Sequence, residues 1–193
     1  MEKIRILSVF GTRPEAVKMA PLIRELSARE GVECLCCVTG QHRELLREVL
    51  DAFSLRPDRD LDIMEEGQTL SDITARTLRG MDAALEDLRP DLVLVQGDTG
   101  ATFAGALSAF YHRIPVGHVE AGLRTYDRYS PYPEEMNRRM VSALAELHFC
   151  PTEANRANLA REGISVPRWY RRLAFTSSPC SISLSESFPV IWA

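Results

Sequence analysis

The segment from His118 to Arg138 concentrates the side chains most able to do chemistry. It contains four carboxylates and three arginines around a run rich in Tyr, Ser and Pro between Thr125 and Pro133. Neither a core strand nor a solvated helix needs this mixture, so the segment predicts a site for a polar, anionic ligand. The carboxylates are Glu120, Asp127, Glu134 and Glu135, and the arginines are Arg124, Arg128 and Arg138.

Another acid, Asp98, closely follows the apolar run at 91–96. Acids at the ends of successive strands are common catalytic residues in α/β active sites. Asp98, Glu120 and the nearby His118 could each have a structural role instead. Asp98 could cap the helix that follows it. Glu120, expected to be buried, needs a partner, for which Arg124 is one candidate. His118 could be a satisfied core histidine or a functional one.

Composition narrows the class of protein. The chain has 193 residues, 45% hydrophobic and 26% charged, as is ordinary for a globular domain. A net charge of -4 gives no electrostatic case for nucleic acid or an anionic membrane. No apolar run approaches the roughly 20 residues of a membrane helix. The N-terminus enters a strand without a signal-peptide cleavage site, so a cytoplasmic protein is expected.

Three of the five cysteines, Cys34, Cys36 and Cys37, lie in one predicted strand, where cross-links between them are geometrically poor. We interpret them as small buried thiols in a reducing compartment. No second cluster of Cys and His has metal-ligand spacing, so no metal site is predicted.

Apolar runs alternate with amphipathic segments along most of the chain, which predicts an α/β fold with a doubly wound parallel sheet. Residues 56–68 are expected to be a polar loop. Strands are expected at 4–10, 32–39, 91–96, 115–119 and 147–150. Helices are expected after Thr12 and after 40–42, and over about 69–88, 101–112, 134–146 and 152–162.

Two phosphate-binding signatures, G-x-G-x-x-G and G-x-x-x-x-G-K-[ST], do not occur in the sequence. The segment Gly11-Thr12-Arg13 could still hold an anion through backbone N–H groups at a helix N-terminus and the Arg13 guanidinium. Arg13 could equally be a surface cation. Because both signatures are missing from the sequence, no dinucleotide cofactor is predicted.

Five segments carry a specific resemblance. They are VFGTRPEAVKMAPLIREL, VTGQHRELLREVL, PDLVLVQGDTGATFAGALSAFY, RIPVGHVEAGLRTYDRYSPYPEEMNRR and HFCPTEANRANL. In order and spacing they resemble the bacterial non-hydrolysing UDP-N-acetylglucosamine 2-epimerases. Gly100 and Ala101 depart from the family, which usually has further Thr or Ser there.

This resemblance implies a Rossmann-like domain, one of the two that make up a glycosyltransferase-B type fold, with the ligand in the cleft between them. It implies inversion of C2 in UDP-GlcNAc to give UDP-ManNAc, a step towards cell-surface polysaccharides. The family breaks the anomeric C–O bond, loses the C2 proton to give a bound glycal and UDP, and then readds UDP with protonation on the opposite face.

The resemblance also assigns roles to residues. Asp98, Glu120 and Glu134 match the family's acid/base carboxylates. Arg13 matches a UDP-contacting arginine, and Lys18 lies near it. No cofactor is implied.

Three further residues, Gln41, His42 and Arg43, match positions near a regulatory UDP-GlcNAc site of the family. The implied partners are UDP-GlcNAc and UDP, and a full-length chain is expected to be a homodimer.

Residues 1–165 are expected to form the N-terminal domain of such an enzyme. From 166 to 193 the chain is Ser-rich and loses its periodicity, which we interpret as a truncation or a change of reading frame, a natural Ser-rich tail being the alternative. With its second domain missing, the chain is expected to be inactive alone. A hydrolysing epimerase, a glycosyltransferase of the same architecture and a non-catalytic domain remain alternatives.

Overall fold

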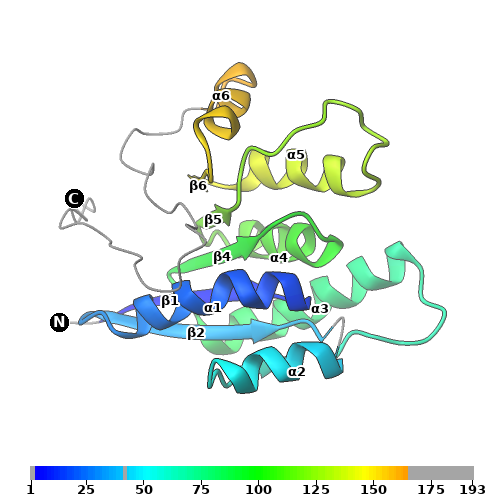
Figure 1. The fold of residues 1–193 in the computed structure, drawn as a ribbon. Helices are drawn as coiled ribbons and strands as arrows, with labels where there is room; N and C mark the ends of the chain where they lie inside the picture. The colour runs from blue at the N-terminus through cyan, green and yellow to red at the C-terminus, as the bar shows by residue number, and fades with distance from the viewer. Residues whose placement is uncertain (1–2, 41–42, 165–193) are drawn as a thin grey trace.

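The computed structural model describes residues 3–40 and 43–164 (Figure 1). Their strands form one parallel sheet in the order β3-β2-β1-β4-β5-β6, which confirms the predicted α/β fold. The strands are β1 (Ile4–Phe10), β2 (Val32–Val38), β3 (Arg59–Asp60), β4 (Leu92–Gln96), β5 (Val116–Val119) and β6 (Leu147–Phe149). The helices are α1 (Arg13–Ser27), α2 (Arg43–Ala52), α3 (Leu70–Leu88), α4 (Gly100–Tyr111), α5 (Glu134–Leu144) and α6 (Glu153–Arg161).

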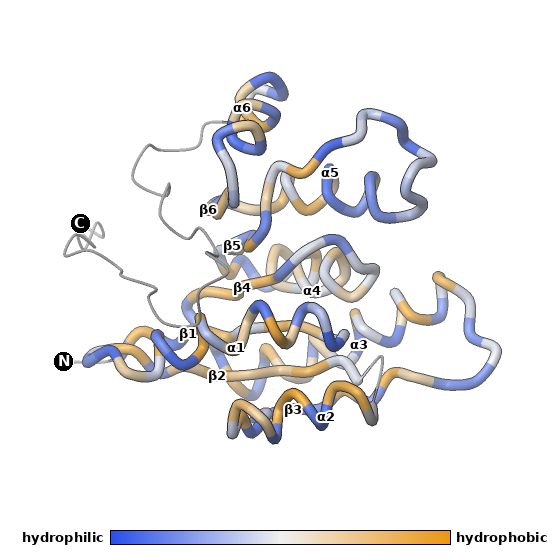
Figure 2. Tube along the Cα trace, viewed as in Figure 1, coloured by the Kyte–Doolittle hydropathy of each residue, from blue (hydrophilic) through white to orange (hydrophobic). Residues whose placement is uncertain are grey.

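The sheet is buried on both faces because side chains of each central strand alternate between two cores. In β1, Ile6 and Phe10 belong to a cluster with α1 and α2, whereas Leu7 and Val9 pack with α3, α4 and α5. Figure 2 shows β2 and β4 largely in the hydrophobic colour. The two-sided core fixes the strands and therefore fixes the loops at their carboxyl ends.

The strand order reverses between β1 and β4, since the chain runs outward to β2 and β3 before it returns. In open α/β sheets, ligands bind outside the carboxyl ends of the strands at such a point. The loops that follow Phe10, Gln96 and Val119 lie at this edge. They carry the motifs that the sequence singled out.

The predicted elements are confirmed within a few residues, apart from one strand. Thr12 and Thr69 cap α1 and α3 with capping boxes, as the helix-start signals indicated. The prediction that 56–68 is only a loop was wrong, because Arg59–Asp60 pairs with β2. This two-residue strand is exposed at the sheet edge and has no apolar side chain, so no pattern marked it.

Four cysteines of the described ranges are free. Cys36 and Cys37 are buried, in agreement with their interpretation as core thiols, whereas Cys34 is only partly buried. Burial raises the pKa of the Cys37 thiol to about 12. None of the described helices is long and apolar enough to cross a membrane. The predictions for 166–193 lie outside the described residues.

Candidate active site at the carboxyl edge of the sheet

Glu120 follows β5 directly and projects its carboxylate towards α1. It accepts hydrogen bonds from Lys18 Nζ, at 2.8 Å to Oε1 and 2.7 Å to Oε2, and from Gln96 Nε2 at the end of β4. The candidate pairing with Arg124 was therefore wrong, and so was the expected burial, because the Glu120 side chain is 24% exposed. The Arg124 side chain is fully buried and instead binds both carboxylate oxygens of Glu162 at 2.8 Å.

The backbone of Glu120 is in the left-handed region, with φ of 68°. A residue with a β-carbon adopts this region rarely and at a cost of about 1–3 kcal/mol. Such strain persists only where surrounding contacts enforce it, and it gathers at active sites. The strain at Glu120 turns the chain so that its carboxylate lies over the Gly97 turn, where a β-carbon on Gly97 would lie 3.9 Å from Glu120 Oε2.

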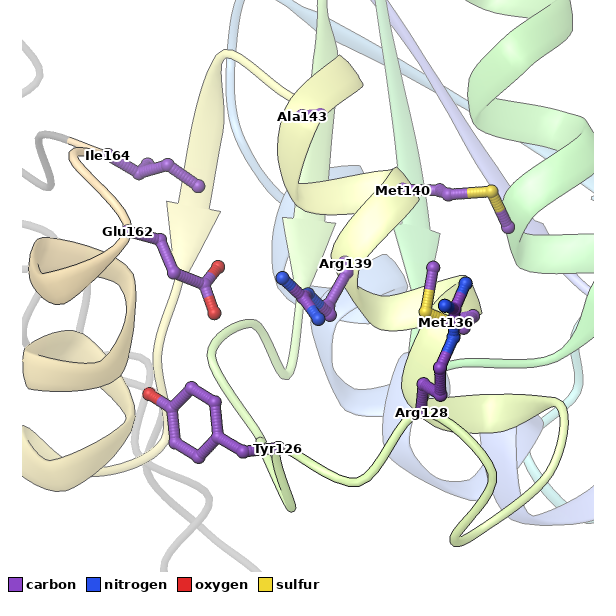
Figure 3. A pocket seen from close by; sticks show the side chains of 8 residues that line it. All are labelled: Tyr126, Arg128, Met136, Arg139, Met140, Ala143, Glu162 and Ile164. Atoms are coloured by element: carbon purple, nitrogen blue, oxygen red, sulfur yellow. The ribbon is translucent and has the colours of Figure 1, made fainter.

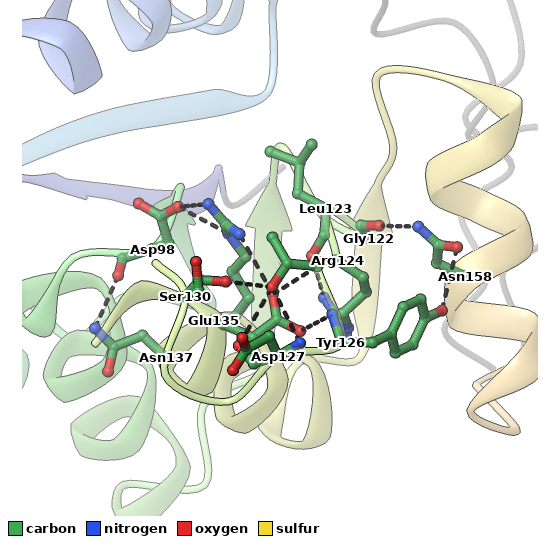
Figure 4. Close-up of polar contacts among 12 residues, drawn as sticks. Asp98, Gly122, Leu123, Arg124, Tyr126, Asp127, Ser130, Glu135, Asn137 and Asn158 are labelled. Atoms are coloured by element: carbon green, nitrogen blue, oxygen red, sulfur yellow. Dashed lines mark hydrogen bonds and ion pairs between the residues drawn. The ribbon is translucent and has the colours of Figure 1, made fainter. Parts of the chain in front are cut away.

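Asp98 lies in the turn between β4 and α4. Thr99 caps α4, so the alternative of Asp98 as the cap was wrong. The Asp98 carboxylate pairs with Arg138, whose Nη2 and Nε lie 2.7 and 2.8 Å from Oδ2. Asn137 donates to the Asp98 carbonyl at 2.8 Å (Figure 4). Helix α5 thus holds both the side chain and the main chain of this acid.

His118 lies beneath the same turn and is fully buried. Its Nε2 is 2.8 Å from the carbonyl oxygen of Gly97, which can only accept, so we assign the proton to Nε2. Burial lowers the pKa of His118 to about 4, so the ring is neutral at neutral pH. His118 is thus a core histidine that supports the turn before Asp98, but it is only partly satisfied, because its buried Nδ1 has no hydrogen-bond partner among the described residues.

Glu134 and Glu135 are adjacent at the start of α5, yet their environments differ. Glu134 Oε2 is buried and has no hydrogen-bond partner among the described residues. Glu135 is fully buried and accepts from the backbone N–H groups of Thr125 and Tyr126 at 3.0 and 3.2 Å. Glu134 is therefore the one of the pair with bonding capacity to offer a ligand.

The loop after β1 differs from the sequence-based hypothesis of a backbone anion site. The N–H groups of Gly11 and Thr12 both donate to Glu15 Oε2, at 2.7 and 2.8 Å. Burial raises the pKa of Glu15, and these two hydrogen bonds oppose the rise. Arg13, in the first turn of α1, is exposed. Any anion there would meet the Arg13 side chain, because the two amides are already occupied.

Of the regulatory-site residues expected from sequence, Gln41 and His42 lie outside the described residues. Arg43 begins α2, but its side chain is also outside the described part. The structure therefore leaves these three assignments as predictions. No group of three or more His, Cys, Asp or Glu side chains in residues 3–40 and 43–164 is arranged to hold a metal ion.

A groove of about 700 Å³ lies on the other face of α5 (Figure 3). None of the candidate acids lines it. Its α5 residues have helical spacing and face away from Asn137 and Arg138. The lining residues are Tyr126, Arg128, Met136, Arg139, Met140, Ala143, Glu162 and Ile164.

Gln96 and Asn137, which help to hold the two acids in place, were not singled out from the sequence, and Arg138 was named only as a cation for an anionic ligand, whereas it pairs with Asp98 and Glu135. Two signals could have found them. Gln96 is the single polar residue that ends an apolar strand. Asn137 and Arg138 lie about one turn after Glu134, on the same face of α5.

The comparisons with known proteins agree on one family. The family model described as UDP-N-acetylglucosamine 2-epimerase matches residues 24–169. A Thermotoga maritima relative is 63% identical over 83% of this chain and 43% of its own length. The UDP-N-acetylglucosamine 2-epimerase of Bacillus subtilis is 56% identical over 84% of this chain and 43% of its own. The chain spans about half the length of the curated relatives it matches.

Solved structures match this chain over a similar share of their own length. The Neisseria meningitidis UDP-GlcNAc 2-epimerase bound to UDP-GlcNAc is 52% identical, with a TM-score of 0.82 over 84% of this chain and 44% of that one. The Methanocaldococcus jannaschii enzyme in complex with UDP-GlcNAc and UDP is 36% identical, with a TM-score of 0.78 over 84% and 44%. Acinetobacter baumannii MurG, 14% identical with a TM-score of 0.55 over 76% and 40%, shares the fold alone.

Proposed function

Because the chain belongs to the UDP-N-acetylglucosamine 2-epimerase family, we propose that it supplies the acid/base half of an enzyme that converts UDP-GlcNAc to UDP-ManNAc. The supporting observation is the pair of carboxylates at the ends of adjacent strands. Asp98 follows β4 and Glu120 follows β5, and each is ion-paired with a cation from a helix elsewhere in the chain.

The chemistry explains why carboxylates are needed at this place. The C2 proton has no neighbouring carbonyl to acidify it, so the anomeric C–O bond breaks first and UDP departs with the bonding electrons. Positive charge at C1 then makes the C2 proton removable, one carboxylate takes it, and a glycal remains bound. UDP then adds back to C1, and a carboxyl group returns a proton to the opposite face of C2.

Within this proposal, Asp98, Glu120 and Glu134 handle the proton. Asp98 and Glu120 are each held at the sheet edge by an ion pair, which fixes where their carboxylates would meet the sugar. Glu134 brings a buried oxygen that has no hydrogen-bond partner within residues 3–40 and 43–164, which suits contact with a hydroxyl or a carbon-bound proton.

Arg13 and Lys18 bind the diphosphate in the proposal. Arg13 is exposed at the start of α1, and Lys18 lies five residues further along the same helix, where it contacts Glu120. In the proposal both cations offset negative charge that develops on the departing UDP. Gln41, His42 and Arg43 are proposed to border a regulatory site, on the strength of the family resemblance alone.

We also propose that residues 1–165 correspond to the first of two domains, with the nucleotide held mainly by the second. A site divided in this way loses most of its binding energy and positioning when one domain is missing. The 193-residue chain is then expected to bind UDP weakly and to convert no measurable UDP-GlcNAc. The full-length protein is proposed to be cytoplasmic and to form a homodimer. Light scattering of that protein would test its oligomeric state.

The test is a chimera in which residues 1–164 are followed by the C-terminal half of the Bacillus subtilis relative. Incubation with UDP-GlcNAc should give UDP-ManNAc without an added acceptor. Release of free ManNAc would identify a hydrolysing epimerase instead. A requirement for an acceptor sugar would identify a glycosyltransferase. A folded chimera with no turnover would contradict the proposal.

A further inference from the structure

Glu135 is a buried acid that the proposed reaction leaves unused. It is completely enclosed, and its two oxygens accept the backbone N–H groups of Thr125 and Tyr126 (Figure 4). Tyr126 has φ of 63°, so these successive amides point at the carboxylate from a strained turn. A carboxylate enclosed in this way cannot reach a substrate.

Arg138 connects Glu135 with Asp98. Its Nη1 lies 3.4 Å from Glu135 Oε2, while its Nη2 and Nε lie 2.7 and 2.8 Å from Asp98 Oδ2. The Arg138 side chain is only 15% exposed. Because the guanidinium is planar and rigid, a contact at Nη1 restricts the directions in which Nη2 and Nε can point.

We propose that Glu135 is a positioning residue that orients Arg138 and, through it, the carboxylate of Asp98. The inference rests on the proposed function, since it gives Glu135 a catalytic effect only if Asp98 has one. Glu135 anchors the far side of the guanidinium to the turn at Thr125 and Tyr126. Asp98 therefore receives an ion pair whose direction is set before substrate arrives.

A simpler role for Glu135 would be to hold the turn before α5 and nothing more. The two roles differ in what else depends on Glu135. A structural acid would affect stability and rate whatever residue stands at 98. A positioning acid loses its effect on rate once the Asp98 carboxylate is gone, because the two act as one unit.

The first experiment uses the 193-residue chain and the ¹⁵N-coupled Nε–H signal of Arg138, assigned by its loss in Arg138→Lys. The signal should be sharp and protected from exchange in the parent chain, and broadened or lost in Glu135→Gln. The control is Glu162→Gln, which removes the carboxylate from a different glutamate–arginine pair, that of Glu162 with the buried Arg124. An unchanged Arg138 signal in Glu135→Gln, or equal loss in Glu162→Gln, would overturn the proposal.

The second experiment is a double-mutant cycle in the chimera. Glu135→Gln should lower kcat about 10- to 100-fold, as small misplacements of catalytic groups do. In the Asp98→Asn background the same change should cost less than about 3-fold. Equal losses in both backgrounds would show a structural role. If Glu135→Gln does not fold, Arg138→Lys, which keeps the charge but cannot bridge both acids, must show the same dependence on Asp98.

These outcomes separate the inference from the proposed function. If Asp98→Asn leaves the rate unchanged, the proposed function fails, and the Arg138 signal alone decides whether Glu135 orients the guanidinium. If Asp98→Asn lowers the rate while Glu135→Gln does not, the inference alone fails.

Discussion

The two acids at the sheet edge are held by different cations. Asp98 is paired with Arg138, whose side chain is 15% exposed and is anchored behind by Glu135. Glu120 is paired with Lys18, whose side chain is 40% exposed. The Asp98 cluster is therefore fixed by side chains, whereas the Glu120 carboxylate is positioned chiefly by its strained backbone and by Gln96.

This difference indicates that Arg138 and Lys18 have different roles. Arginine offers a rigid fork, while lysine is a flexible point charge that can turn to another anion at little cost. We infer that Lys18 can leave Glu120 for a diphosphate oxygen, whereas Arg138 stays with Asp98. The groups around Asp98 then keep its geometry through the reaction, and those around Glu120 respond to the ligand.

The largest expected effect comes from removing the acids themselves. In the chimera, Asp98→Asn, Glu120→Gln and Glu134→Gln should each lower kcat about 100- to 10,000-fold, the usual worth of general acid–base catalysis. UDP affinity should change little, because the amides keep their size. Asp127→Asn is the control, since Asp127 is an exposed acid of the neighbouring loop. A variant that weakens UDP binding but keeps its rate per bound substrate would mark that acid as structural.

Lowering the pH should reduce the stability of the fold around Asp98, because His118, which lies beneath the turn before Asp98, becomes protonated. The pKa of His118 is depressed to about 4 from 6.5, so the unfolded chain binds its proton more readily. Its contribution to stability is therefore complete above about pH 6.5 and is lost as pH falls towards 4, by at most about 3 kcal/mol.

Urea unfolding of the 193-residue chain between pH 4 and 7 measures this loss. His118→Gln can keep a donor for the Gly97 carbonyl but cannot ionise, so its stability should fall less steeply with acid than that of the parent. Subtracting the two curves removes the titration of His148, whose pKa burial also lowers. Parallel curves would show that His118 is not the group responsible.

Removing the two cations, Arg138 and Lys18, should lower the free energy of unfolding by different amounts. Arg138→Met leaves the enclosed Glu135 without its cation and should lower the free energy of unfolding by about 2–3 kcal/mol. Lys18→Met removes a partly exposed pair and should cost less than about 1 kcal/mol. Chemical denaturation of both variants tests this. Equal losses would mean that the clusters are equally rigid and would remove the basis for assigning them different roles.

Much of the fold follows from local pattern. Apolar runs such as the one that became β4 predicted buried parallel strands, and threonines such as Thr12 and Thr69 predicted helix starts. β3 was missed because its pairing depends on the position of β2, and its own residues carry no apolar signal.

For the site, the sequence pointed to the acids but not to their partners. Asp98 and Glu120 stood out by their place after strands, but their partners lie 40 and 102 residues away. Proximity in sequence favoured Arg124 for Glu120, yet the turn at Glu120 leaves Arg124 with Glu162. Only the assembled fold distinguishes such partners.

The most direct test of the central claim is proton exchange at C2. The chimera is incubated with UDP-GlcNAc in deuterium oxide, and the sugars are analysed by mass spectrometry and NMR. We expect UDP-ManNAc with deuterium at C2, and incorporation that falls in parallel with the rate in Asp98→Asn and Glu120→Gln. UDP-ManNAc that keeps the original hydrogen at C2, or full incorporation in both variants, would contradict the claim that these carboxylates move the C2 proton.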